Sequence, residues 1–122
     1  MKKFSLILFG LLILLNACQG VEKNTFKLNG TTNLPEGKQI FRIQANANNQ
    51  PTTIDTATVA NGQFSFKGSV EQIDVNFLFV EGEQVNTPFI VEEGIIEVNL
   101  LQERLAEMNL AGTPSNNDLQ TY

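Results

Sequence analysis

The sequence contains no histidine and no tryptophan, and it has a single cysteine among its 122 residues. Without histidine, the chain lacks the most common general base and the most common neutral metal ligand. One cysteine can form neither an internal disulfide nor a Cys-x-x-Cys redox pair. We therefore expect a protein that is not an enzyme, with no cofactor, no bound metal and no catalytic residue.

Basic residues are also scarce, since eight Lys and Arg stand against 13 Asp and Glu and give a net charge of −5. Removal of residues 1–17 would take away Lys2 and Lys3, leaving six basic and 13 acidic residues and a net charge of −7. Such a domain is repelled by nucleic acid, which we exclude as a partner. The hydrophobic content of 42% is ordinary for one small globular domain.

The first 17 residues, MKKFSLILFGLLILLNA, have the composition of a signal peptide for secretion. Lys2 and Lys3 form a charged start, and a nearly unbroken apolar run follows from Phe4 to Leu15. This run is much shorter than the roughly 20 residues that span a bilayer. We interpret residues 1–17 as a cleaved signal-peptide helix rather than a transmembrane anchor.

The next feature is the sequence Leu15-Asn16-Ala17-Cys18, which resembles a bacterial lipobox, although Asn16 is an unusual second residue. The resemblance implies cleavage between Ala17 and Cys18 and attachment of a diacylglycerol to the Cys18 thiol. Burial of two or more acyl chains would anchor the protein stably to a membrane. Residues 18–24 would form a tether with Glu22 as its one acidic residue. We expect a lipid-anchored protein of the bacterial cell envelope, on the periplasmic side of the outer membrane.

The dipeptide Asn61-Gly62 predicts a β-turn of type I′, which requires positive φ at both residues. A two-residue loop would pair Val59 with Phe64 on an apolar face, with Thr and Ser on the other face. The sequence thus predicts a hairpin over residues 54–70. Glu93-Gly94 predicts a second hairpin in the same way, pairing Val91 with Ile96.

Alternating or continuous apolar residues predict further strands. They cover residues 25–32, 39–47, 75–80, 85–91, 95–100 and a short stretch near 107–111. In the second of these, Phe41 and Ile43 form the apolar face, which leaves Ile40 among polar residues. The run VNFLFV at 75–80 is nearly continuous in apolar residues, so we expect this strand to be covered on both faces.

Seven or eight short strands separated by turns indicate an all-β fold, a small antiparallel β-sandwich or partly open barrel. We assign the signal peptide to residues 1–17, a tether to 18–24, the β-sandwich domain to 25–112, and the start of a truncated helix or a linker to 113–122. Ser115 or Asn116 would serve as the N-cap of that helix.

Four stretches resemble the lipoprotein domain known as domain of unknown function 4369. They are F-x-L-x-G at 26–30, IDTA at 54–57, NGQFSFKG at 61–68 and GTPSN at 112–116. In that family the domain follows a lipobox and often precedes a thioredoxin-like thiol–disulfide module. The present sequence lacks the Cys-x-x-Cys of that module, so no redox role is transferred to any residue.

Asp55-Thr56-Ala57 resembles a signal for O-glycosylation used in the periplasm of some Gram-negative bacteria. Thr56 is therefore a candidate glycosylation site, on the exposed face of the predicted hairpin. The alternative is a strand that is rich in Thr because Thr suits strands. Five glutamates near two turns could in principle bind calcium, but they lack the spacing of a calcium loop, and acidic residues at strand ends are usually solvated. They are Glu81, Glu83, Glu92, Glu93 and Glu97.

The leading functional hypothesis is a lipid-anchored accessory or binding module of the cell envelope without catalytic activity. An alternative is the anchoring N-terminal fragment of a thiol–disulfide oxidoreductase, with a thioredoxin-like partner. A second alternative is a lipoprotein that binds a small ligand or a glycan. A deep aromatic-lined cleft would favour ligand binding, whereas a convex sandwich with one exposed apolar edge strand would favour the accessory or binding module.

Overall fold

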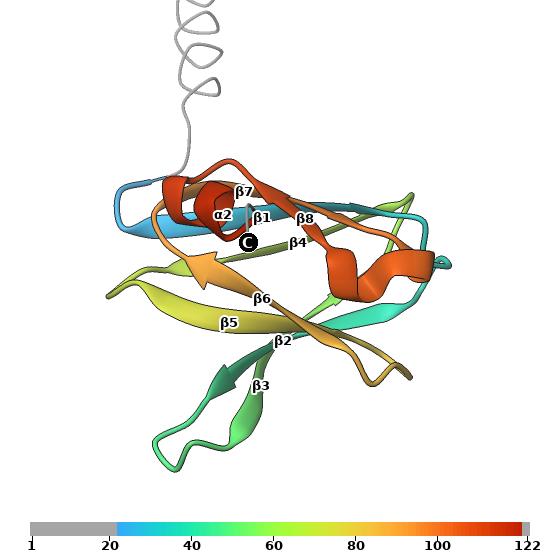
Figure 1. Cartoon of the computed structure of the whole chain (residues 1–122), viewed down its shortest axis with the longest axis horizontal. Coiled ribbons are helices and arrows are strands. Elements are labelled where there is room, and N and C mark those ends of the chain that lie inside the picture. Colours follow the sequence, from blue (N-terminus) through green and yellow to red (C-terminus); the bar gives the residue numbers. More distant parts are fainter. Residues whose placement is uncertain (1–21, 121–122) are drawn as a thin grey trace, which may run out of the picture.

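The computed structural model describes residues 22–120, which form two four-stranded β-sheets packed face to face (Figure 1). Sheet A has the strand order β4-β1-β7-β8, and sheet B has the order β3-β2-β5-β6. The strands are β1 (Thr25–Thr32), β2 (Gln39–Ala45), β3 (Pro51–Thr58), β4 (Gln63–Ser69), β5 (Asp74–Val80), β6 (Asn86–Val91), β7 (Gly94–Leu100) and β8 (Asn109–Ala111). The predicted all-β sandwich is confirmed, and the two sheets do not close into a barrel.

The core lies between the inner faces of the two sheets, because side chains alternate along each strand. Sheet A contributes Phe26, Leu28, Phe64, Phe66, Ile96 and Val98, and sheet B contributes Ile40, Leu78, Val80 and Phe89. The 3₁₀ helix η1 (Gln102–Glu107) follows β7 and adds the buried Leu105. The outer face of sheet A is polar, as expected for a sheet with one solvated side.

The turn at Asn61-Gly62 forms as predicted, with φ of 54° and 71° and a pairing of Ala60 with Gln63. The hairpin prediction is otherwise wrong, because β3 pairs with β2 in sheet B and β4 pairs with β1 in sheet A. Val59 and Phe64 nevertheless both face the core. Turn chemistry is local, whereas the partner of each strand depends on contacts elsewhere in the chain.

The predicted hairpin at Glu93-Gly94 is also wrong. Strand β6 belongs to sheet B, and β7 crosses to sheet A, where it pairs in parallel with β1 and antiparallel with β8. Gly94 makes this crossing at a φ of 126°, which a residue with a side chain rarely adopts. The predicted last strand is confirmed as β8.

The face assigned to β2 is inverted in the structure. Ile40 is fully buried in the core and Arg42 also points inward, whereas Phe41 and Ile43 lie on the outer face of sheet B at partial exposure. Alternation favoured the other face, because Phe41, Ile43 and Ala45 alternate with polar residues while Ile40 is the single apolar residue among them. The inward orientation of Arg42 is explained by its interaction partners, which are described below.

The helix α2 (Pro114–Gln120) packs on the sandwich through Leu119 and through hydrogen bonds to β6. Its Asn116 side chain is fully buried, and it accepts from Ile90 N at 2.8 Å and donates to Ile90 O at 2.8 Å. Asn116 thus satisfies the backbone of an edge strand as another strand would. The predicted N-cap is wrong, because the helix begins at Pro114, which suits the first turn, so that Ser115 and Asn116 both lie inside it.

Candidate functional site

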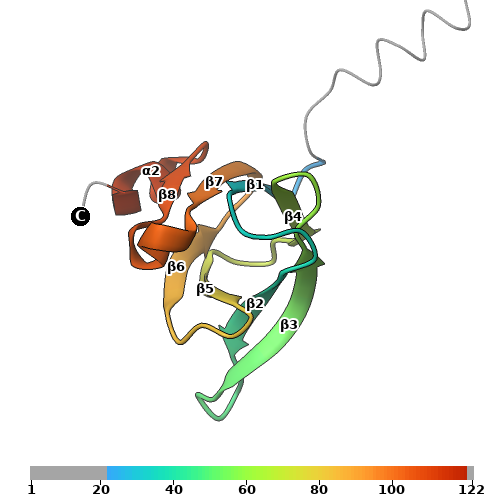
Figure 2. The ribbon, with the colours of Figure 1, turned by 90° about the vertical axis from the view of Figure 1, so that its right-hand side faces the viewer.

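The predicted cleavage and lipidation site at Ala17 and Cys18 lies outside the described residues. Among residues 22–120, no helix has the length and apolar character needed to cross a bilayer. Strand β1 begins at Thr25 in sheet A, so the described chain starts on the side of the sandwich opposite to sheet B (Figure 2).

Thr56, the candidate glycosylation site, is exposed on β3, which is an edge strand of sheet B. Its backbone N donates to Asp55 Oδ1 at 2.9 Å. In register, Thr56 lies beside Phe41 on the outer face of the sheet. The structure leaves the Thr56 side chain accessible at the border of an apolar surface.

The five glutamates considered for calcium do not come together, and residues 22–120 hold no group of three or more carboxylate, His or Cys ligands. Glu92 is buried, and its carboxylate accepts from Ser115 N at 2.7 Å and from Ser115 Oγ at 2.9 Å. Burial acts to raise the pKa of Glu92, but hydrogen bonds from Thr113, Ser115 and Asn116 outweigh it and lower the pKa. This pair fixes the start of α2, and we assign it no role in catalysis.

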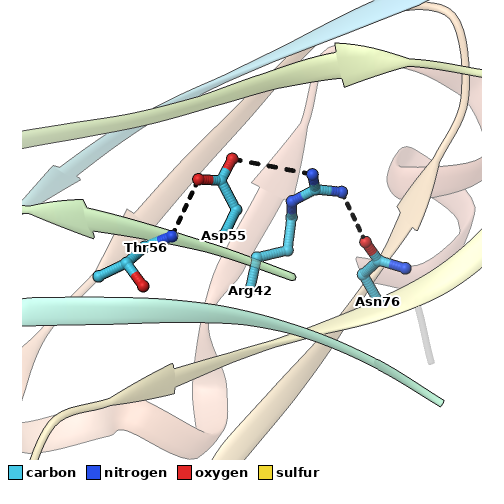
Figure 3. A network of polar contacts seen from close by, with 4 residues as sticks. All are labelled: Arg42, Asp55, Thr56 and Asn76. Atoms are coloured by element: carbon cyan, nitrogen blue, oxygen red, sulfur yellow. Dashed lines mark hydrogen bonds and ion pairs between the residues drawn. The ribbon is translucent and has the colours of Figure 1, made fainter. Parts of the chain in front are cut away.

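A polar network inside the sandwich is the first unusual feature of sheet B (Figure 3). The Arg42 side chain is only 13% exposed, and its Nη1 donates to Asn76 Oδ1 at 2.9 Å. Its Nη2 lies 3.8 Å from Asp55 Oδ2, and its guanidinium lies 5.1 Å from the ring centroid of Phe26. Burial lowers the pKa of Arg42, and Asp55 opposes this effect. Within the described part of the chain, Arg42 Nε has no hydrogen-bond partner.

All charged residues in the strands of sheet B lie on its inner face, which is the face toward sheet A. Asp55 faces Arg42, and Asp74 accepts from Gln44 Nε2 at 2.9 Å. A hollow of about 310 Å³ lies beside this network, lined by polar residues from β2, β4, β5 and the β4–β5 loop and by Val91 of β6. A second hollow of about 550 Å³ lies between β6, β8, η1 and α2. Neither hollow is lined by an aromatic side chain.

The outer face of sheet B is apolar. Phe41 pairs with Phe79 in register, and their ring centroids lie 6.5 Å apart. The neighbouring row joins Ile43 to Phe77 and Phe77 to Pro88. We define the Phe-rich face as the outward side chains Phe41, Ile43, Val75, Phe77, Phe79, Pro88 and Ile90. No outward position of β2, β3, β5 or β6 carries a charge, because the outward residues of β3 and the remaining ones of β6 are Pro, Thr and Asn.

The Phe-rich face is open in the described chain. Figure 1 and Figure 2 show no helix or other strand on this side of sheet B. Val75 is 42% exposed, and Phe41, Phe77 and Phe79 are only partly buried. The expectation that β5 is covered on both faces is therefore wrong within residues 22–120. The residues of β5 are apolar on both faces, but the sandwich covers only one of these faces. An apolar strand face that stays exposed indicates an interaction surface.

The structure thus defines a β-sandwich with a buried polar network under one sheet and an uncharged aromatic outer face. Residues 26–119 match the model of the family described as Domain of unknown function (DUF4369), and the chain belongs to this family. The resemblance drawn from the four sequence stretches is confirmed. No curated protein and no solved structure matches the chain.

Proposed function

We propose that this chain is a lipid-anchored module of the bacterial cell envelope that binds a protein through the Phe-rich face and has no catalytic activity. The observation that carries this proposal is the composition of that face. Three of the seven Phe that follow residue 17 lie on it rather than in the core. Exposed apolar surface of this kind is typical of protein interfaces, where aromatic residues contribute most of the binding energy.

The site geometry supports a protein partner more than a small ligand. The two hollows described above lack aromatic walls, and a larger hollow of about 680 Å³ beside β1 and β4 has Phe64 as its single aromatic lining residue, whereas small-molecule sites are mostly concave and apolar. The Phe-rich face is a broad sheet surface without charge, which suits another apolar surface. The leader and the sequence LNAC support the anchor, which would hold the module at the periplasmic side of the outer membrane.

The anchor is tested by the mass of the mature N-terminal peptide from a Gram-negative host. We expect a lipid-modified Cys18 as the first residue, and we expect Cys18→Ser to retain its leader. An unmodified N-terminal Met1 in the mature protein would contradict the anchor.

The binding face is tested by placing a photo-crosslinking amino acid at Val75 or at Ile95. These side chains are 42% and 37% exposed and point outward from sheet B and sheet A, respectively. We expect cross-linked products in intact cells from position 75 and few from position 95. Equal products from both positions, or none from 75, would contradict a binding role for this face.

A further inference from the structure

We infer that the partner of the Phe-rich face is a second copy of this chain, so that two sandwiches associate face to face through sheet B. This inference rests on the proposed function, whose binding surface it uses. Its first support is the distribution of charge. A chain of net charge −7 beyond residue 17 repels its own copies, but the Phe-rich face brings no charged side chain into contact with its mate.

The same face does not suit a lipid surface or a highly charged partner. Protein surfaces that lie on membranes use Lys and Arg around an apolar centre, with Trp or Tyr at the interface. The outward positions of β2, β3, β5 and β6 hold none of these four residue types. A basic partner would be attracted to the acidic surfaces of the rest of the protein and not to the Phe-rich face. The uncharged Phe-rich face therefore suits a partner surface that is also uncharged and apolar.

The arrangement of side chains on the Phe-rich face is compatible with twofold symmetry. The aromatic side chains lie on the central strands β2 and β5, Pro88 and Ile90 lie on the edge strand β6, and Thr side chains lie on the edge strand β3. A twofold axis between β2 and β5 would place the two aromatic ridges against one another and β3 of each copy over β6 of the other. Two twisted sheets pack in this way at an angle of about 30° and a distance of about 10 Å.

The size of the face sets the strength of the association. Four strands at about 4.8 Å spacing and about seven residues at about 3.3 Å rise cover roughly 450 Å². Two copies would bury about 900 Å², which is below the 1,200 Å² or more of stable interfaces. We therefore infer a weak dimer that forms at the high local concentration of a shared membrane. The described chain starts at sheet A, so its first residues leave the Phe-rich face of sheet B free to meet a second copy.

The test uses the full chain in cells, with Val75→Cys or the matched Ile95→Cys and a short bis-maleimide reagent. Two copies with tags of different size are expressed together, so that a product carrying both tags identifies self-association. We expect the mixed product from Val75→Cys and not from Ile95→Cys. Adding Phe77→Ser to Val75→Cys should reduce the product about tenfold, the loss expected for an aromatic residue at the centre of an interface.

The outcomes separate this inference from the proposed function. Cross-linking of Val75→Cys to a different protein would overturn the dimer and leave the binding function in place. A glycan on Thr56 would also overturn the dimer if the mixed product appeared only after Thr56→Ala was introduced. The glycan would then cover the surface beside Phe41 in the native protein. Absence of any product at position 75, with both cysteine variants exported in equal amounts, would overturn the dimer and the binding function together.

Discussion

Gly30 of β1 and Phe64 of β4 are direct cross-strand partners, and the Phe64 ring lies in the space that a side chain at position 30 would need. The two residues come from two of the stretches that resemble the family, F-x-L-x-G and NGQFSFKG. Their pairing gives both stretches one structural reason. The glycine allows an aromatic ring to lie against the backbone of the neighbouring strand.

We expect Gly30→Ala to destabilise the domain by about 1–3 kcal/mol, because the new methyl group forces Phe64 out of its position. Urea denaturation measures this loss. Ser65→Ala, at an exposed position next to Phe64, should change stability by less than about 0.5 kcal/mol. Phe64→Leu combined with Gly30→Ala should cost less than the sum of the single changes. Strict additivity would show that the two residues do not share this space.

The stability of the domain should depend on Arg42 so closely that even replacement by another cationic residue lowers it. Arg42→Lys loses the hydrogen bond from Nη1 to Asn76 and the planar contact with Phe26, and we expect a loss of about 1–3 kcal/mol. Asp55→Asn should cost less than about 1 kcal/mol, because Asp55 is 40% exposed and its ion pair is partly solvated. A larger effect at Asp55 than at Arg42 in thermal or urea unfolding would contradict this order.

Glu92 should make stability depend on pH in the acid range. Its pKa is lower in the folded state than in the unfolded state, so the unfolded state binds more protons and stability rises with pH. The contribution of Glu92 is complete above the ordinary carboxylate pKa of 4.5 and is lost as the pH falls through its lower folded value. We expect Glu92→Gln to cost about 1–3 kcal/mol at neutral pH and progressively less in acid.

The control for this prediction is Glu93→Gln, which changes the exposed neighbour and should leave the acid unfolding curve unaltered. Free energies of unfolding measured from pH 7 downward give the comparison. If the curves of the wild-type protein and of Glu92→Gln stay parallel through the acid range, the hydrogen bonds to Ser115 do not set the pKa of Glu92.

Local chemistry made much of the fold predictable. The bounds of β1 follow from its alternation, and the turn at Asn61-Gly62 follows from residues that adopt positive φ. Strand partners were not predictable in this way. The chain crosses between the two sheets four times, after β1, β3, β4 and β6, and the parallel pairing of β1 with β7 joins segments far apart in sequence.

The candidate site escaped prediction for a related reason. Alternation in β2 favoured Phe41 as an inner residue, because a charged residue inside a sandwich is normally costly. Arg42 is accommodated only through Asn76, Asp55 and Phe26, which come from three other strands. The apolar run of β5 did carry the signal for an interface, but its meaning required knowledge that nothing in the described chain covers one face.

The most direct test of the account is hydroxyl-radical footprinting of the wild-type protein, in its native envelope and after solubilisation and dilution. We predict that Phe77 and Phe79 are protected in the envelope and become reactive on dilution. Ile95 on the opposite sheet should react equally in both states, and the buried Phe26 should react in neither. Equal labelling of Phe77 and Phe79 in the two states would show that nothing covers the Phe-rich face and would contradict its role as an interface.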